Sequence, residues 1–190
     1  MRTISIFGAS GGLARAIART FLSHEWKVIA VCRMHSENKL KDEFSSEIAL
    51  KNLEIVTVHR SYSEHEFQQA SDIILFTQAL FEPSPLIDMK SEDINDEIKV
   101  GLIDQIHLTQ KYLKKYPSNQ DRPRNICFIG STSAYAGFKN TSVYCAVKHG
   151  LLGFVRALND EYAHTSDRFW LFSMGTMLTE MGNKVQGQDS

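Results

Sequence analysis

The sequence has few cysteines, almost no net charge and no long hydrophobic run, and each absence excludes a class of protein. Its three cysteines among 190 residues lack the spacing of a metal site, so we expect reduced thiols in a cytosolic protein. Its seven histidines are also scattered, and we expect no metal. The net charge of −1 gives no electrostatic reason to expect a nucleic acid or an anionic membrane as partner. No apolar run could span a bilayer, and the N-terminus lacks the layout of a signal peptide.

The composition is that of an ordinary globular domain, with 43% hydrophobic and 23% charged residues. The length suits one domain, which we place at residues 1–190 with a loose polar tail at 182–190. Short apolar segments alternate with amphipathic ones. The expected strands are Thr3–Phe7, Lys27–Cys32, Leu53–Val58, Asp72–Phe76, Asn125–Gly130 and Phe169–Ser173. The expected helices are Gly12–His24, Ser36–Leu50, Ser63–Ala70, Ser91–Tyr116 and Ser142–His164.

Most of the expected strands are rich in Ile, Val and Phe without regular alternation, which is typical of strands buried on both faces. Strands that alternate with helices indicate a parallel sheet with right-handed crossovers. We therefore predict an α/β fold, a doubly wound parallel sheet of about six strands with helices on both faces.

A glycine-rich turn, Gly8-Ala9-Ser10-Gly11-Gly12-Leu13-Ala14, follows the first expected strand. Glycine lets the backbone turn tightly and lets a pyrophosphate approach it. The N-terminus of the next helix supplies free N–H groups and the positive end of the helix dipole. Because the turn lies on the first strand of an alternating chain, we favour a dinucleotide site in a Rossmann-type fold over a plain tight turn.

The end of the second expected strand bears on the choice of dinucleotide. An acidic residue there would bind the ribose 2′-hydroxyl of NAD, but this chain has Cys32 followed by Arg33. An arginine attracts a 2′-phosphate, whereas an acid would repel it. We therefore predict NADP(H) over NAD(H); the alternative is an Arg33 that only faces solvent.

A tyrosine and a lysine four residues apart, Tyr144 and Lys148, lie on one face of an expected helix. A phenol has an ordinary pKa of about 10, and a cation one helical turn away lowers that pKa by favouring the phenolate. Such a tyrosine can donate and accept protons near neutral pH. Alone the pair is a weak pattern, since it occurs by chance on many helix surfaces.

The glycine turn, Ser131 and the Tyr144–Lys148 pair together resemble the short-chain dehydrogenase/reductase family, of the classical type. The distance along the chain from Ser131 to Tyr144 agrees with the family's spacing. The segment Met174-Gly175-Thr176-Met177-Leu178-Thr179 looks like the family's Pro-Gly turn and the threonine near the nicotinamide. The resemblance covers nearly the whole chain, and its parts stand in the expected order.

The resemblance implies an oxidoreductase that interconverts a small carbonyl compound and its alcohol. Ser131 would hydrogen-bond the substrate carbonyl oxygen, and Tyr144 would give that oxygen its proton. Lys148 would bind the nicotinamide ribose and hold the Tyr144 pKa down. The expected coenzyme-binding residues are Gly8, Ser10, Gly11, Gly12, Leu13, Arg33, Thr77, Gln78, Ala79, Tyr144, Lys148, Gly175 and Thr179.

The chain departs from the family at four places. Thr77-Gln78-Ala79-Leu80 stands where the family has Asn-Asn-Ala-Gly, and Gly101 replaces a catalytic asparagine that supports proton relay to the lysine. His59-Arg60-Ser61 replaces an aspartate near the adenine. The chain stops at Ser190, before the substrate-covering segment and seventh strand of most members. We therefore expect a pocket that is open or closed by a partner subunit.

Three functions fit these residues. The leading one is a cytoplasmic NADPH-dependent carbonyl reductase or the reverse alcohol dehydrogenase. The second is a catalytically weak or inactive NADP(H)-binding sensor or regulatory protein, favoured by the altered Thr77–Leu80 segment and by Gly101. The third is a nucleotide-sugar epimerase or dehydratase, which shares the Tyr-x-x-x-Lys pattern but uses a larger substrate domain. We also expect a homodimer through helices 91–116 and 142–164, which resemble the family's dimerisation pair.

Overall fold

Six parallel strands form the sheet, in the spatial order β3-β2-β1-β4-β5-β6. The computed structural model describes residues 1–118 and 122–175. The strands are β1 (Thr3–Phe7), β2 (Lys27–Arg33), β3 (Leu53–Val58), β4 (Ile73–Phe76), β5 (Asn125–Ser131) and β6 (Arg168–Met174). Each predicted strand is present to within one residue at either end, and the predicted Rossmann-type sheet is confirmed.

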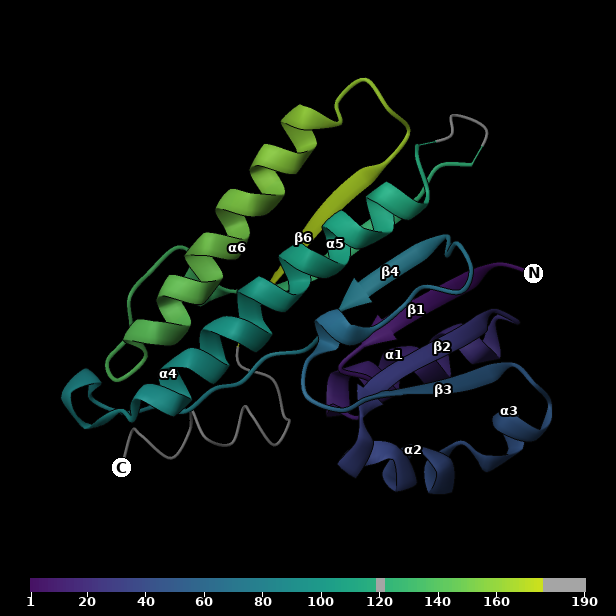
Figure 1. Cartoon of the computed structure of the whole chain (residues 1–190), viewed down its shortest axis with the longest axis horizontal. Coiled ribbons are helices and arrows are strands. Elements are labelled where there is room, and N and C mark those ends of the chain that lie inside the picture. The colour runs from purple at the N-terminus through teal and green to yellow at the C-terminus, as the bar shows by residue number, and fades with distance from the viewer. Residues whose placement is uncertain (119–121, 176–190) are drawn as a thin grey trace.

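Helices cover both faces of this sheet (Figure 1). They are α1 (Gly12–Ser23), α2 (Glu37–Glu43), α3 (Ser45–Ala49), α4 (Ser91–Ile98), α5 (Asp104–Lys115) and α6 (Ser142–Glu161). Short 3₁₀ turns are Met34–Ser36, Tyr62–Glu64, Leu86–Asp88 and Thr132–Ala134. One core cluster packs α1 and α2 against one face of the sheet, and a second packs α5 and α6 against the other. The two faces are thus buried by two different sets of helices, as a doubly wound fold requires.

The predicted helix Ser63–Ala70 is wrong, because only the 3₁₀ turn Tyr62–Glu64 forms there. Backbone carbonyl groups that a helix would use internally are bonded by a side chain of α5 instead. Lys111 Nζ donates to the carbonyl oxygens of Ser63 and His65 at 2.9 and 3.2 Å. An irregular connection is stable here because its backbone acceptors are satisfied from outside.

The predicted helix Ser36–Leu50 is two short helices, α2 and α3. The backbone leaves helical geometry at Phe44, where φ is −122° and ψ is 30°, and the Phe44 ring is buried in the core with α1 and α2. The predictions Gly12–His24 and Ser142–His164 are right in type but extend one and three residues past the ends of α1 and α6.

The predicted helix Ser91–Tyr116 is α4 and α5 joined by a π-helical turn, Lys99–Ile103. Gly101 lies in this turn and is buried. A Cβ atom on Gly101 would lie 2.6 Å from Cγ1 of Val147 on α6. The glycine at this π turn therefore allows α6 to approach closely. In Figure 1, α6 runs alongside the continuous helical segment formed by α4, the π turn and α5, which we call the α4–α5 rod.

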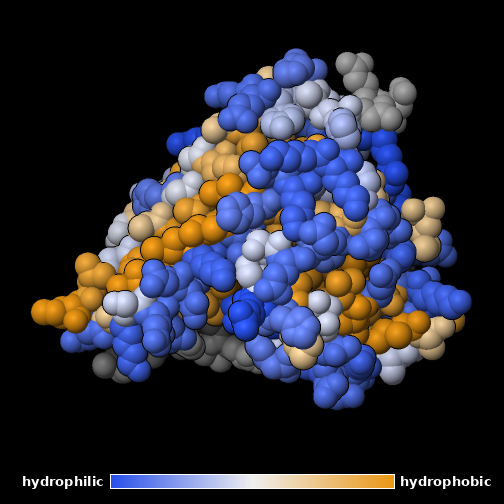
Figure 2. All heavy atoms as spheres, in the orientation of Figure 1, coloured by the Kyte–Doolittle hydropathy of each residue, from blue (hydrophilic) through white to orange (hydrophobic). Residues whose placement is uncertain are grey.

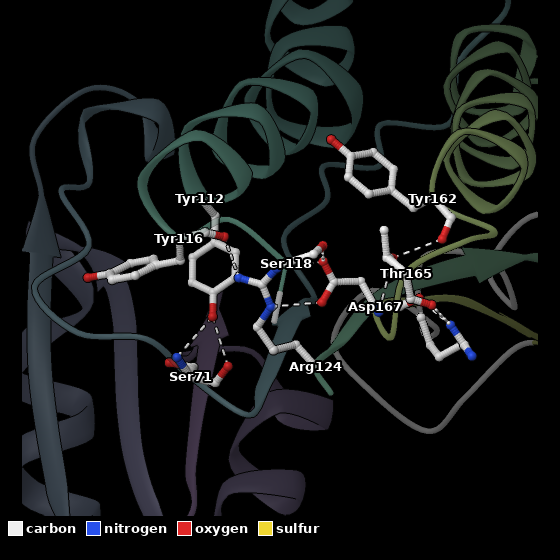
Figure 3. Close-up of polar contacts among 9 residues, drawn as sticks. Ser71, Tyr112, Tyr116, Ser118, Arg124, Tyr162, Thr165 and Asp167 are labelled. Atoms are coloured by element: carbon white, nitrogen blue, oxygen red, sulfur yellow. Dashed lines mark hydrogen bonds and ion pairs between the residues drawn. The ribbon is translucent and has the colours of Figure 1, made fainter. Parts of the chain in front are cut away.

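A buried ion pair joins the N-terminal ends of β5 and β6 (Figure 3). The Arg124 guanidinium donates to the Asp167 carboxylate through Nε at 2.8 Å and Nη2 at 2.5 Å, and the two side chains are 5% and 0% exposed. Arg124 Nη1 also donates to the Tyr116 carbonyl oxygen at 2.6 Å, and Ser118 Oγ donates to Asp167. This network lies at the edge of the sheet opposite the strands' carboxyl ends and fastens the connections that enter β5 and β6.

Two classes of feature are absent from residues 1–118 and 122–175. No helix there is long and apolar enough to cross a membrane. No group of three or more His, Cys, Asp or Glu side chains there could hold a metal ion.

Cys32, Cys127 and Cys145 are free and buried. The predicted tail at 182–190 lies outside the described residues.

Candidate active site

The candidate site lies at the edge of the sheet that the carboxyl ends of the strands form. β1 pairs with β2 on one side and with β4 on the other, so the crossovers reverse direction at β1. Open parallel sheets bind ligands at such a switch point, outside the carboxyl ends of their strands. The strand arrowheads in Figure 1 point toward the side where α4 and the start of α6 lie.

The turn between β1 and α1 is shaped for close approach of a ligand. Gly8 has a φ of +79°, and a Cβ on it would lie 2.8 Å from the Gln78 backbone nitrogen, so only glycine fits. Gly11 is the N-cap of α1 and provides no side-chain capping bond, and the first turn of α1 contains no acidic residue. Such a helix start suits a phosphate group. The other predicted residues of the turn are Ser10 and Leu13, which are half-buried, and Gly12, which is exposed.

The segment after β4 is fastened to this turn and to α5. Thr77 Oγ1 donates to the Phe7 carbonyl oxygen at 2.7 Å, and the Gln78 carbonyl oxygen accepts from Gln105 Nε2 at 3.1 Å. The Gln78 side chain is buried, and neither atom of its amide has a hydrogen-bond partner among the described residues. Ala79 is half-buried beside it. These residues replace the family's Asn-Asn-Ala and keep a backbone connection between β1, β4 and α5.

The end of β2 presents a cation. Arg33 is the last residue of β2 and is half-buried, with its guanidinium carbon 5.9 Å from the centroid of the Tyr62 ring. Cys32 before it is buried, and burial raises the pKa of its thiol to about 11. Arg33 therefore lies at the strand end where a dinucleotide's adenosine ribose binds in this kind of fold.

The structure brings the side chains of Ser131, Tyr144 and Lys148 together. Ser131 ends β5, and its hydroxyl is hydrogen-bonded to the phenol of Tyr144 in the first turn of α6. Lys148 Nζ lies 5.3 Å from the centroid of the Tyr144 ring and donates to the Ile129 carbonyl oxygen at 2.8 Å. The Phe81 ring packs edge-on against the Tyr144 ring, with 4.9 Å between the centroids.

The expectation that Lys148 holds the Tyr144 pKa down is wrong for this arrangement. Burial raises the pKa of Tyr144 above its ordinary value, and the hydrogen bond with Ser131 offsets part of that rise. Burial lowers the pKa of Lys148 to about 8, because the ammonium has lost its solvent. The Lys148 ammonium also donates to a backbone carbonyl rather than to the phenol.

Sequence reasoning missed Glu97, in the last turn of α4. Its side chain is 2% exposed, and burial raises the pKa of its carboxyl to about 7. The charge of Glu97 acts on both Lys148 and Tyr144. The signal was its position four residues before Gly101, which places the two residues on one face of the rod.

The remaining predicted residues lie after β6. Gly175 directly follows that strand and is exposed. Thr179 lies outside the described residues.

Comparison with known protein families agrees with this geometry. The family model for short chain dehydrogenases matches residues 2–190. The chain belongs to the short chain dehydrogenase family. It is therefore an oxidoreductase of a family that uses NAD(P)(H) and acts on small carbonyl or alcohol compounds.

Two curated relatives illustrate the likeness in sequence. The chain is 29% identical over 196 residues to the 3-oxoacyl-(acyl-carrier-protein) reductase FabG of Buchnera aphidicola subsp. Acyrthosiphon pisum (strain APS). The alignment covers 98% of this chain and 79% of the relative. It is 25% identical over 191 residues to carbonyl reductase family member 4 of Xenopus laevis, which covers 97% of this chain and 79% of the relative.

Solved structures illustrate the likeness in fold. ElxO with NADP bound matches with a TM-score of 0.82 at 19% identity, covering 100% of this chain and 79% of that one. A 4-hydroxyisoleucine dehydrogenase mutant complexed with NADH and succinate matches with a TM-score of 0.86 at 23% identity, covering 98% and 78%. At these identities the matches show a shared fold.

Proposed function

We propose that this chain is an NADP(H)-dependent oxidoreductase that reduces a small carbonyl compound to its alcohol, or catalyses the reverse. The observation that carries the proposal is the hydrogen-bonded Ser131–Tyr144 pair, with Lys148 beside it, at the same sheet edge as the glycine turn. A binding module alone has no use for a serine hydroxyl, a phenol and an amine converging at one point.

Each of the three side chains has a separate role in this proposal. Ser131 and Tyr144 hydrogen-bond the substrate carbonyl oxygen, and Tyr144 gives that oxygen a proton while the coenzyme supplies hydride. Lys148 holds the nicotinamide ribose and keeps positive charge beside the phenol. The Phe81 ring excludes water from one side of Tyr144. The chain's own contribution is thus positioning and a proton source in a partly dry site.

NADP(H) is the proposed coenzyme because of the cation at the end of β2. Arg33 is half-buried there, while Cys32 carries no charge at neutral pH because burial raises its thiol pKa to about 11. Dissociation constants for NADPH and NADH test this, with Arg33→Ala losing at least about tenfold in NADPH affinity and little in NADH affinity. Equal or tighter binding of NADH by the unaltered chain would contradict the preference.

The first substrates to offer are ketones, because the curated relatives are named as a 3-oxoacyl reductase and a carbonyl reductase. The test follows the absorbance of NADPH with an acetoacetyl thioester, small ketones, aldehydes and quinones. Tyr144→Phe removes only the hydroxyl and should abolish turnover while NADPH still binds. Tyr162→Phe, at the far end of α6, is the matched control and should keep the activity.

A second candidate function is a coenzyme-binding sensor with little turnover. Two observations favour it: burial raises the pKa of Tyr144, and Gly101 supplies no side chain to the site. Tight NADPH binding with no turnover on the whole panel would select this function over the reductase.

We also propose the homodimer that the sequence predicts, through the face formed by α4, α5 and α6. Hydrophobic atoms form a diagonal band over these helices in Figure 2, and the band continues to the 3₁₀ turn Leu86–Asp88. Of the large hydrophobic residues in these segments, Ile87 in the 3₁₀ turn is 92% exposed, and Ile103 between α4 and α5 is 41% exposed. Light scattering should give the mass of two chains, and Ile103→Glu should shift it toward one. A monomeric wild type at micromolar concentration would contradict the dimer. The cytoplasmic location stays a prediction.

A further inference from the structure

Glu97 is a buried carboxyl with one oxygen bonded and the other without a partner. It lies in the last turn of α4 and is 2% exposed. One carboxylate oxygen accepts from the Glu82 backbone N–H, in the loop after β4. Oε1 has no hydrogen-bond partner among the described residues. A buried unpartnered carboxylate oxygen is costly, so it calls for an explanation by function or by a bound group.

The surroundings of Glu97 are polar along one face of the α4–α5 rod. Glu97, Gly101 and Gln105 are spaced four residues apart, and all three are buried. Gln105 Nε2 donates to the carbonyl oxygens of Gly101 and Gln78 at 3.0 and 3.1 Å, while its Oε1 has no partner among the described residues. The Gln78 amide is also buried and unpartnered among those residues, so Glu97, Gln105 and Gln78 all present buried polar atoms without a partner there.

Lys148 faces this rod from α6. It is buried, and its ammonium donates to the Ile129 carbonyl oxygen at 2.8 Å. An ammonium has three donors, so it can serve a water or a carboxylate as well. Glu97 is also the charged group that acts on Lys148, and its carboxylate raises the Lys148 pKa against the lowering by burial.

The same loop covers both ends of this arrangement. Phe81 packs against the Tyr144 ring, and the neighbouring Glu82 backbone bonds Glu97. Tyr144 and Glu97 therefore contact neighbouring residues of one short segment.

We propose that Glu97 is the residue that exchanges protons with the buried Lys148, and that this exchange returns a proton to Tyr144 between turnovers. The inference rests on the proposed function for its role in turnover, but its electrostatic part concerns the protein alone. Because Glu97 acts through Lys148 and Tyr144, it is a positioning residue and not a catalytic one.

The proton balance closes with solvent as the source. Tyr144 gives its phenolic proton to the alkoxide that hydride addition leaves on the substrate. The Tyr144 phenolate takes a proton from the Lys148 ammonium through a bridging water, since that ammonium donates to the Ile129 carbonyl oxygen and not to the phenol. The neutral amine then takes a proton from the Glu97 carboxylic acid, also through water. The Glu97 carboxylate is then protonated again from solvent.

The charged groups around Glu97 set the pH at which this exchange operates. Burial raises the Glu97 pKa to about 7; the carboxylates of Glu82 and Asp93 raise it as well, and the Lys148 ammonium lowers it. Glu97 in turn raises the Tyr144 pKa. Reduction should therefore slow as the pH rises through about 7, because Glu97 then loses the proton it delivers.

The first test needs no substrate. In protein labelled with ¹⁵N at the lysine side chains, the Lys148 signal is assigned by its loss in Lys148→Arg and titrated by NMR. Glu97→Gln keeps an acceptor for the Glu82 N–H and removes the charge, so it should lower the Lys148 pKa by about one unit. Asp96→Asn removes the same charge from an exposed neighbour on α4 and should leave the Lys148 titration unchanged. An unchanged titration in Glu97→Gln would overturn the proposal.

The second test is the pH profile of kcat with NADPH and an acetoacetyl thioester. Glu97→Gln should lower kcat about tenfold or more at about pH 6 and remove the fall in kcat near pH 7. Glu97→Asp keeps a titrating carboxyl and should still show a fall in kcat with rising pH. A Glu97→Gln profile that matches wild type in height and shape would overturn the relay. If the wild type binds NADPH but turns over nothing, the proposed function fails, and the lysine titration still decides whether Glu97 and Lys148 are coupled.

Discussion

Helix α6 leaves no room for a side chain at Gly101, so Gly101→Ala should be less stable than an unhindered Gly→Ala change. The added Cβ would lie 2.6 Å from Cγ1 of Val147, which is itself 2% exposed and cannot swing into solvent. Overpacking of this kind costs about 1–3 kcal/mol. Alanine is better than glycine in a helix by about 1 kcal/mol, which offsets part of that cost. The expected net loss in the free energy of unfolding is about 0–2 kcal/mol, and it is about 1–3 kcal/mol larger than for an alanine that meets no neighbour.

The partner substitution tests the cause of this loss. Val147→Ala alone removes two buried methyl groups and should cost about 2 kcal/mol. In the double variant the methyl group added at position 101 would take up space that the valine leaves, so the two losses should not add. The double variant should be more stable than the sum of the single losses predicts, by about 1–2 kcal/mol.

Urea unfolding followed by circular dichroism measures these differences, provided that the slope with denaturant stays constant. The matched control is Gly153→Ala on α6, where a Cβ would meet nothing within 4 Å. That control should stabilise the protein by up to about 1 kcal/mol. A Gly101→Ala variant as stable as Gly153→Ala, or strictly additive effects at positions 101 and 147, would refute the steric explanation.

Three further changes have expected outcomes. Asp167→Asn leaves the Arg124 guanidinium buried without its counter-charge and should lower the free energy of unfolding by about 3–5 kcal/mol in urea; a loss under about 1 kcal/mol would contradict this. Gly8→Ala should lose both stability, by about 1–3 kcal/mol, and NADPH affinity, because φ is +79° and Gln78 blocks the Cβ; calorimetry showing unchanged affinity would count against a coenzyme turn. Burial raises the Glu97 pKa from 4.5 to about 7, so its contribution to stability is present below pH 4.5 and is lost as the pH rises through about 7. The size is about 3 kcal/mol, and Glu97→Gln should lack this fall, which lies between pH 4.5 and about 7; parallel curves would contradict it.

The sequence was sufficient for the sheet because β1, β2, β4 and β5 are buried on both faces, and such apolar runs are recognisable without context. It was less reliable where a helix depends on what lies beside it. The segment Ser63–Ala70 is amphipathic, but its carbonyl groups are bonded by Lys111, which is remote in the chain. Phe44 interrupts the helix predicted at Ser36–Leu50 because its ring is drawn into the core. In both cases a tertiary contact overrides the local pattern.

The candidate site divides in the same way. Its residues at strand ends and in the first turns of α1 and α6 were predictable, since topology alone assembles them. The pKa of Tyr144 was not, because spacing on a helix gives the nearness of Lys148 but not the burial of both groups. Glu97 was missed because a glutamate in the acidic helix Ser91–Ile98 is typical of a surface residue, and only its spacing of four residues from Gly101 pointed to the buried face.

Gly101 and Glu97 are best understood as one rearrangement of the rod. With Val147 filling the space at position 101, no side chain larger than hydrogen fits there, so a polar group cannot act from that position. The next place on the same face toward the strand ends is one turn earlier, and this chain has a buried carboxyl there. Unlike an amide, that carboxyl titrates, and burial raises its pKa to about 7, close to the about 8 of Lys148. A site with two buried groups that exchange a proton near neutral pH should respond to pH more steeply than one that relies on a neutral side chain.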